Sequence, residues 1–317
     1  MCDCISEILS LYGIENTRTT LLRHNENRTY RIDYKDQTFC LRIKTPISGF
    51  DLSAFGGNRE ILLRNELDII NALGEQTDIP VQKPIKTMSG DFVAKLSDET
   101  LASLLTWMDG EPFDVGQHTE QMLVSAGQTL AKLRCAVETN PNLNSFPRFS
   151  YDQRLVENLA MKVEQGSEYL SAEAIRSIRK ALDTVYEVMS DMDECEEALL
   201  VHADPGLGNM IWTSERVGLI DWSLSGYAHS YMDLGGLMGA TPDQDEQRLL
   251  LKGWESVRGK VNRRYLDAYF ALSVLLFVCC QHTRAKEWSD WFPEALERWQ
   301  ETIFDPFSLG HQIPCIL

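Results

Sequence analysis

The segment at residues 201–221, VHADPGLGNMIWTSERVGLID, restricts the folds open to this chain more than any other stretch. Asp204 and Asn209 lie five residues apart, where glycine and proline predict a loop. Two short apolar runs follow, and the polar residues 213–216 between them predict a β-hairpin that ends at Asp221. Because a loop, a hairpin and a strand end can meet at one point, the segment predicts a cluster of three oxygen-bearing side chains.

Phosphoryl transfer from ATP requires such a cluster. One carboxylate orients the attacking hydroxyl and accepts its proton, and further oxygen atoms hold Mg²⁺. We therefore expect Asp204 to be the catalytic residue, and Asn209 and Asp221 to be the metal ligands. The sequence contains neither GxxxxGK(S/T) nor GxGxxG, which excludes the P-loop and dinucleotide-binding signatures.

Charge and cysteine content narrow the partners and the compartment. Lys and Arg number 30 against 47 Asp and Glu, so the formal net charge is −17. An acidic chain repels phosphate backbones, so we expect no nucleic acid partner, while a cationic small molecule would be attracted. The first residues lack the pattern of a signal peptide, and the apolar run 271–280 is shorter than the about 20 residues that cross a bilayer, so we expect no membrane segment. Eight cysteines without CxxC spacing favour reduced thiols and a cytoplasmic protein.

The chain is predicted to form two domains, residues 1–108 and 109–317. In the first, apolar spacing and turn residues predict, in order, a helix over 1–13, strands over 29–34 and 38–43, a helix over 58–73, and strands over 92–96 and 101–108. In the second, they predict a helix over 119–138, helices over 152–194 with a break at Gly166, an apolar segment over 198–201 that leads into the loop, the hairpin described above, and helices from residue 244 onward.

These motifs resemble those of the aminoglycoside phosphotransferase and choline kinase family, a branch of the protein-kinase-like enzymes. That family carries an H-x-D-x-x-x-x-N loop followed by an I-D-F or I-D-W metal aspartate. This chain has His202, Asp204 and Asn209, followed by Asp221 in the sequence Ile-Asp-Trp. The resemblance implies an α+β, bilobal protein-kinase-like fold with a small antiparallel β-sheet N-lobe and a larger, mainly helical C-lobe.

The resemblance also implies two residues of structural support. His202 would hold the catalytic loop through hydrogen bonds, and Asp233, in a run from a glycine to an Asp-Leu pair at residues 226–234, would brace the same loop. At residues 130–134 the chain has L-A-K-L-R where the family has L-A-x-L-H. Arg134 therefore replaces a histidine that we expect to be a packing residue.

The N-terminal part resembles the elements that hold the phosphates of ATP in this family. Residues 24–30 are similar to a phosphate-covering loop with an E-N-R-x-Y pattern, which implies that Asn27 contributes to ATP binding. Residues 39–43 resemble the strand that bears the phosphate-contacting base, here Arg42. Because alternate residues of a strand share one face, Lys44 is the alternative base.

Two further ATP contacts are implied by the same resemblance. Glu66 matches the acidic partner of the phosphate-contacting base, and Glu60 is the alternative on the same helix. Residues 105–111 resemble the hinge between lobes, whose backbone groups bind adenine, so Thr106 and Met108 are the expected contacts.

The predicted function is transfer of the γ-phosphate of ATP, with Mg²⁺, to a hydroxyl of a small molecule. An aminoglycoside or another aminated, cationic acceptor fits the acidic charge. The alternatives are an amino alcohol such as choline or homoserine, a serine or threonine of a protein, and a pseudokinase that binds nucleotide without turnover. The complete set of three motif residues favours an enzyme over a pseudokinase. We expect the aromatic cluster of Trp288, Trp291, Phe292 and Trp299 to pack in the core rather than to bind substrate.

Overall fold

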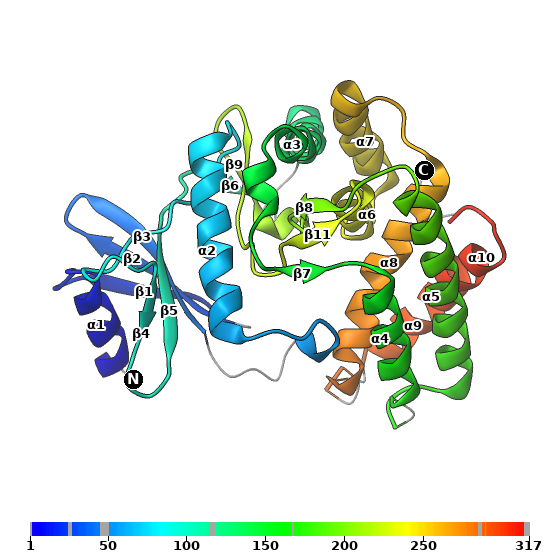
Figure 1. Cartoon of the computed structure of the whole chain (residues 1–317), viewed down its shortest axis with the longest axis horizontal. Coiled ribbons are helices and arrows are strands. Elements are labelled where there is room, and N and C mark those ends of the chain that lie inside the picture. Colours follow the sequence, from blue (N-terminus) through cyan, green and yellow to red (C-terminus); the bar gives the residue numbers. More distant parts are fainter. Residues whose placement is uncertain are drawn as a thin grey trace.

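The computed structural model of the chain describes residues 2–24, 27–44, 51–113, 118–166, 168–284, 287–288 and 290–313. An antiparallel sheet forms the N-terminal end of the molecule, and helices form most of the remainder (Figure 1). The predicted α+β class, with an antiparallel N-terminal sheet and a mainly helical C-terminal part, is therefore confirmed.

The N-terminal sheet has five strands in the order β1-β2-β3-β5-β4, all antiparallel to their neighbours. The strands are β1 (Arg18–His24), β2 (Asn27–Tyr34), β3 (Gln37–Lys44), β4 (Val93–Lys95) and β5 (Leu101–Thr106). The predicted β2–β3 hairpin is confirmed. Strand β1 is not predicted, because its leucines Leu21 and Leu22 are exposed at this sheet edge and only pairing with β2 makes the segment a strand.

Strand β3 shows the expected alternation of faces. Leu41 and Ile43 point to a small apolar core that also contains Ile8 of helix α1 (Cys2–Leu11). Arg42 and Lys44 lie on the opposite face, and both contact Glu66. The period of two along β3 therefore directs both cations to one side of the sheet.

Helix α2 (Arg59–Gln76) lies between the sheet and the C-terminal helices (Figure 1). Asn58 caps it, since the Asn58 side chain accepts hydrogen bonds from two backbone N–H groups of the first turn. Its buried residues Leu63 and Leu67 belong to the larger hydrophobic core, which also includes Leu105 of β5 and the C-terminal helices. The larger of the two apolar cores thus extends through both predicted domains.

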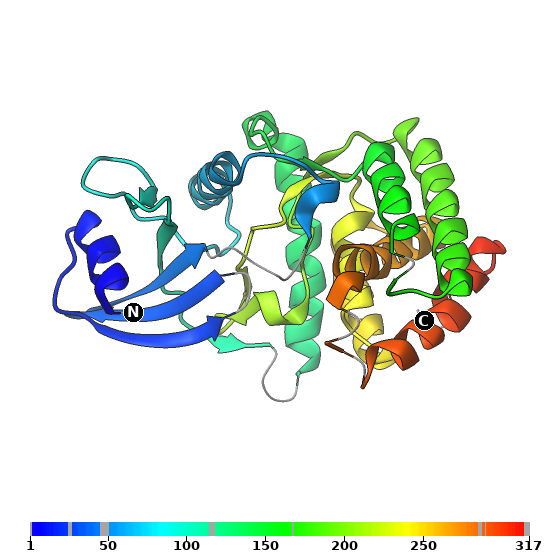
Figure 2. The ribbon, with the colours of Figure 1, turned by 90° about the horizontal axis from the view of Figure 1, so that it is seen from below.

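The helices of the C-terminal part are α3 (Glu120–Thr139), α4 (Gln153–Glu164), α5 (Ala172–Asp193), α6 (Tyr231–Gly239), α7 (Gln244–Arg258), α8 (Arg263–Gln281), α9 (Phe292–Trp299) and α10 (Asp305–Ser308). The N-terminal sheet and the α4–α5 pair lie at opposite ends of the molecule in both views (Figure 2). Among the described residues, α8 is the one helix long and apolar enough to cross a membrane, and 72% of its most apolar window is buried inside the structure.

Two small sheets hold the segment 201–221. One contains β6 (Glu111–Pro112), β9 (Met210–Trp212) and β10 (Val217–Leu219), and the other contains β7 (Phe149–Ser150), β8 (Leu199–Val201) and β11 (Gly226–Ala228). The predicted β9–β10 hairpin is confirmed. The Leu219 N–H donates to the Pro80 carbonyl oxygen at 3.0 Å. This bond connects β10 to the segment that precedes β4.

Candidate active site

The loop between β8 and β9 presents Asp204. The Asn209 amide nitrogen Nδ2 donates to the Asp204 backbone oxygen at 3.0 Å and to its carboxylate Oδ2 at 2.8 Å. The two bonds fix the Asn209 amide, and the second orients the Asp204 carboxylate. They also occupy the nitrogen end of the Asn209 amide, so its oxygen Oδ1 is the atom suited to bind a cation.

His202 is fully buried beneath this loop and connects it to the hairpin. Its Nε2 lies 2.9 Å from the Ile220 carbonyl oxygen, and its Nδ1 accepts a hydrogen bond from the Asp204 N–H at 3.3 Å. These contacts require the neutral ring with the proton on Nε2. Burial lowers the pKa of His202 and keeps it in that form. His202 therefore supports the loop and is placed to position, not to react.

Asp233, in the first turn of α6, holds the same loop from behind. Its carboxylate accepts the backbone N–H groups of His202 at 3.1 Å and Ala203 at 2.7 Å. Ala203 has a φ of 63°, in the left-handed region that a residue with a Cβ seldom adopts. Burial raises the pKa of Asp233, and the hydrogen bonds from the two N–H groups partly oppose that rise. Asp233 thus stabilises a strained turn directly before Asp204.

Asp221 follows β10 and is brought beside Asn209 by the backbone. The Ile220 N–H donates to the Asn209 carbonyl oxygen at 3.0 Å. This bond places the two candidate metal ligands, Asn209 and Asp221, on adjacent segments of the chain. Burial disfavours ionisation of Asp221, but Arg42 and Lys44 outweigh this effect and lower its pKa to about 2. The carboxylate is therefore ionised at neutral pH and suited to bind a cation.

Arg42 joins the sheet to the segment that bears Asp221. Its Nη1 lies 2.6 Å from Glu66 Oε1 and its Nη2 lies 3.2 Å from Asp221 Oδ1. Lys44 Nζ lies 3.8 Å from the second oxygen of Glu66. Although burial disfavours the charges, the two cations outweigh it and lower the pKa of Glu66, so the pair is ionic. Glu60 instead pairs with Arg64 and Lys95 at the surface and does not contact Arg42.

The other expected ATP contacts have different surroundings. Asn27 is buried on β2 opposite Lys44, and its Oδ1 has no hydrogen-bond partner among the described residues. Thr106 bonds within the protein, since its N–H donates to the Lys83 carbonyl and its own carbonyl accepts from Gln82. Met108 approaches β10 so closely that a Cβ at Gly218 would lie 2.3 Å from its sulfur atom.

Arg148, which the motifs do not reveal, fastens the chain after Asp221. Its guanidinium donates to the carbonyl oxygens of Ser223 at 2.6 Å, Ser225 at 2.8 Å and Leu62 of α2 at 2.7 Å. Arg148 therefore connects the helix that bears Glu66 to the segment that follows Asp221. Its partners are backbone carbonyls, which leave no side-chain pattern in a sequence.

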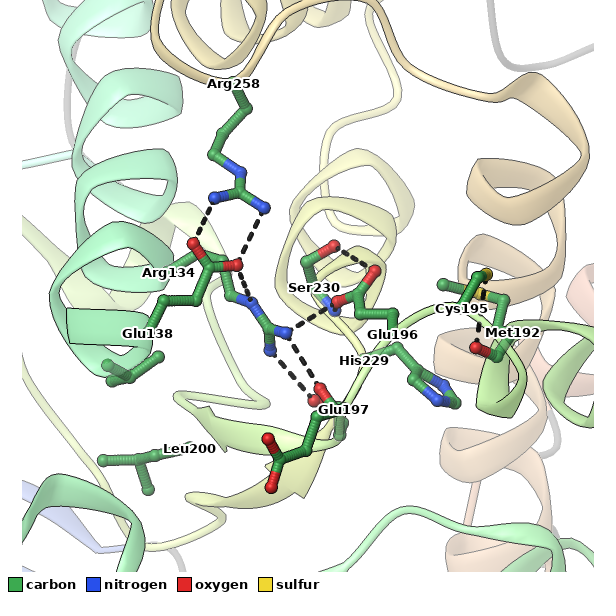
Figure 3. A network of polar contacts seen from close by, with 12 residues as sticks. Arg134, Glu138, Met192, Cys195, Glu196, Glu197, Leu200, His229, Ser230 and Arg258 are labelled. Atoms are coloured by element: carbon green, nitrogen blue, oxygen red, sulfur yellow. Dashed lines mark hydrogen bonds and ion pairs between the residues drawn. The ribbon is translucent and has the colours of Figure 1, made fainter. Parts of the chain in front are cut away.

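Arg134, the residue that departs from the family motif, lies in a polar network at the C-terminal end of α3 (Figure 3). Its guanidinium contacts Glu196 at 2.8 Å and Glu138 at 3.0 Å, and donates to the carbonyl of Glu197 at 2.9 Å. These partners tie α3 to the chain that enters β8.

A cavity of about 460 Å³ opens beside Asp204. Aromatic rings from distant parts of the chain form much of its wall: Phe55, Tyr151, Phe277, Trp291 and Trp299. The predicted aromatic cluster therefore divides. Phe292 is buried in the core as expected, whereas Trp291 is 42% exposed and faces the cavity with Trp299.

Solved structures share this fold at low sequence identity. A microcompartment-associated aminopropanol kinase superposes with a TM-score of 0.73 at 19% identity, covering 95% of this chain and 98% of that chain. An amicoumacin kinase in complex with AMP-PNP and Ca²⁺ gives 0.72 at 15% identity, covering 100% and 95%. A spectinomycin phosphotransferase in complex with ADP and spectinomycin gives 0.63 at 15%, covering 95% and 94%.

The sequence itself was compared with protein families and with curated proteins. No curated protein matches it. The model of the phosphotransferase enzyme family, APH, matches residues 18–273, a span that includes β1, the catalytic-loop motif and most of α8. This match extends over most of the chain and agrees with the fold, so the chain belongs to the phosphotransferase enzyme family.

Proposed function

We propose that this protein is a kinase that transfers the γ-phosphate of ATP, with Mg²⁺, to a hydroxyl group of a small molecule. One observation carries the proposal: the Asp204 carboxylate, oriented by Asn209, lines the cavity of about 460 Å³. Asp221 lies beside Asn209 and contacts Arg42, so a phosphate-binding group and a reacting hydroxyl can meet there. A cavity of this size favours a small acceptor over a protein chain.

The proposed reaction is an in-line displacement at the γ-phosphorus atom. Asp204 orients the acceptor hydroxyl and takes its proton, and the hydroxyl oxygen forms a bond to that phosphorus. The bond from the γ-phosphorus to the oxygen bridging it to the β-phosphorus breaks, and ADP leaves. The products are ADP, a phosphomonoester of the acceptor and the proton held by Asp204.

Asn209 and Asp221 would hold the magnesium ion. An amide oxygen and a carboxylate are the hard donors that Mg²⁺ prefers, and the ion usually rests on one or two carboxylates together with substrate phosphates. In the described part of the chain, no cluster of three or more His, Cys, Asp or Glu is suited to hold a metal. The phosphates of ATP would therefore supply the remaining ligands. When bound, Mg²⁺ neutralises charge on the transferring phosphate.

Arg42, oriented by Glu66, would bind the α- and β-phosphates, with Lys44 beside it. Asn27 supplies a buried amide oxygen on the neighbouring strand and belongs to the same proposed ATP site. Adenine would contact the backbone between Thr106 and Met108. The strand β6 that follows pairs with β9 and not with the N-terminal sheet, which supports a boundary between lobes 1–108 and 109–317.

We further propose a cytoplasmic location. Six cysteines in the described part of the chain are free thiols: Cys4, Cys40, Cys135, Cys195, Cys279 and Cys280. Burial raises the pKa of Cys280 to about 12, so that thiol stays protonated and unreactive. Free thiols are typical of a reducing compartment, where ATP is also available.

Asp204→Asn tests the proposed function. The variant loses the proton acceptor but keeps the shape and the contact with Asn209, so ADP release should fall about 10²–10⁴-fold while binding of ATP and Mg²⁺ persists. Asp245→Asn, at an exposed carboxylate on α7, is the matched control and should retain full turnover. Undiminished turnover in Asp204→Asn contradicts the assignment, and ATP binding without turnover in the wild type identifies a pseudokinase.

A further inference from the structure

We propose that the acceptor is an alcohol with an apolar or aromatic body and at most one positive charge. This inference rests on the proposed kinase function and names the substrate class of the same site. It departs from the expectation of a polycationic, aminoglycoside-like acceptor drawn from the net charge of −17. The evidence is the chemistry of the cavity wall beside Asp204, which we call the acceptor cavity.

Aromatic rings give the acceptor cavity its apolar character. Phe277 of α8 lies 5.8 Å from Trp299 and 6.3 Å from Trp291, measured between ring centroids. On another side, Phe55 contacts Tyr151 at 5.4 Å in an edge-to-face arrangement. These rings hold one another in place, so they present fixed apolar surfaces to a ligand.

The polar atoms of the wall are few, and several are already bonded. The Tyr151 hydroxyl donates to the Leu224 carbonyl at 2.6 Å, and the Ser273 hydroxyl donates to the Phe270 carbonyl at 2.7 Å. Besides Asp204, the described wall offers the Gln281 amide and the indole N–H groups of Trp291 and Trp299. The wall therefore offers little to match a ligand covered with hydroxyl and amino groups.

Charge excludes a polycation from the acceptor cavity. Among the described residues that line it, Asp204 is the single charged side chain, and the proposed reaction already uses that carboxylate. Each further ammonium group of a ligand would lose water without gaining a carboxylate. One cation can still be accommodated, because tryptophan and tyrosine faces attract a single positive charge.

Part of the chain's acidic residues lines a different cavity. A separate cavity of about 600 Å³ between α5 and the α9–α10 region is lined by five acidic residues: Glu168, Glu173, Glu297, Glu301 and Asp305. It shares no lining residue with the acceptor cavity. The net charge therefore does not by itself indicate acidic groups in the acceptor cavity.

An acceptor panel tests the inference on the full chain with ATP and Mg²⁺. It contains 3-phenylpropan-1-ol, its monocationic analogue 2-amino-3-phenylpropan-1-ol, and the polycation kanamycin. ADP release gives kcat/KM, and calorimetry gives binding. We expect kcat/KM for the better phenyl alcohol to exceed that for kanamycin by roughly tenfold or more, since one unpaired charge costs at least that factor.

Two substitutions test the wall itself. Trp291→Ala and Trp299→Ala should each raise the acceptor KM roughly tenfold and leave the KM for ATP unchanged, because each removes a ring that lines the acceptor cavity and is proposed to contact the acceptor and not ATP. Trp291→Phe keeps a ring and should recover most of the loss. Tyr186→Ala is the matched control, since this aromatic residue on α5 is 37% exposed and does not line the cavity.

The outcomes separate this inference from the proposed function. A higher kcat/KM for kanamycin overturns the inference, and so does failure of both phenyl alcohols to bind or react in a protein that binds ATP and Mg²⁺. An unchanged acceptor KM in both tryptophan variants also overturns it. Absence of ATP binding, or turnover that survives Asp204→Asn, instead overturns the proposed kinase function on which the inference rests.

Discussion

Arg42 shows how one side chain can connect two distant parts of the molecule. A guanidinium has two nitrogen atoms that diverge, so Arg42 contacts Glu66 with one and Asp221 with the other. A lysine ammonium has a single nitrogen atom and would not reach Glu66 and Asp221 from two diverging positions as Arg42 does. Lys44 stands on the same strand face at 3.8 Å from Glu66, so the two cations together supply what a lone lysine would not.

Glu66→Gln tests this arrangement at the residue scale. Removing one charge from a buried pair leaves Arg42 poorly compensated, so the free energy of unfolding should fall by about 3 kcal/mol and the KM for ATP should rise. Glu60→Gln, on the same helix but at the surface, should change the free energy of unfolding by less than about 1 kcal/mol. Urea unfolding measures both, and equal effects in the two variants would contradict a specific role for Glu66.

At the scale of elements, helices α3 and α7 of the C-terminal part pack closely against each other. Gly127 and Gly253 face each other across this contact, and a Cβ at Gly127 would lie 1.9 Å from the Leu250 carbonyl oxygen. No side chain fits there without moving a backbone. Helix α3 also bears Arg134, so the α3–α7 contact helps to position the chain that enters β8 and the catalytic loop.

Gly127→Ala should therefore destabilise the protein by about 1–3 kcal/mol, the usual cost of overpacking, or more if the helices separate. Gly74→Ala on α2 is the control, because the added Cβ would meet its nearest neighbour at an ordinary 3.4 Å and alanine favours a helix. The control should be neutral or more stable by up to about 1 kcal/mol. Denaturation midpoints distinguish the two, and a fully stable Gly127→Ala protein would refute the tight contact.

At the scale of the whole molecule, buried histidine makes stability depend on pH. Burial lowers the folded-state pKa of His202 below its unfolded value, so the unfolded chain binds more protons as the pH falls. The contribution of His202 is thus fully present above about pH 6.5 and declines below it. His282 acts in the same direction, whereas His118, whose pKa is raised in spite of burial by Phe113 and Glu246, acts in the opposite one.

His202→Asn should flatten this dependence. Losing one titrating group removes up to about 1.4 kcal/mol per pH unit from the slope of the unfolding free energy between pH 6.5 and pH 5. The variant should also be less stable at pH 7, because it loses contacts with Ile220 and Trp222. Substitution of the exposed His311 serves as the control. An unaltered slope in His202→Asn would mean that His202 is not held neutral.

The sequence alone determined the features that depend on short-range spacing. The loop that presents Asp204 and Asn209, the hairpin that follows it and the pairing of faces along β3 are local, and each was predicted at its residues. Most helices were predicted too, since their apolar stripes recur at helical spacing over a dozen residues or more. Strand β1 was not predicted, because its leucines are exposed and the segment shows no buried apolar face. Arg148 was not predicted, because its partners are backbone carbonyls.

Only the tertiary structure determines which residues form the acceptor cavity and where the acidic residues lie relative to it. The cavity wall combines Phe55, Tyr151, the α8 residues near Phe277, and Trp291 with Trp299, which are far apart in sequence and have no common spacing. Composition counts acidic residues but does not locate them, and the fold places five of them around a different cavity. Spacing within a segment is local information, whereas a cavity exists only where several segments pack together, and that packing is a property of the whole core.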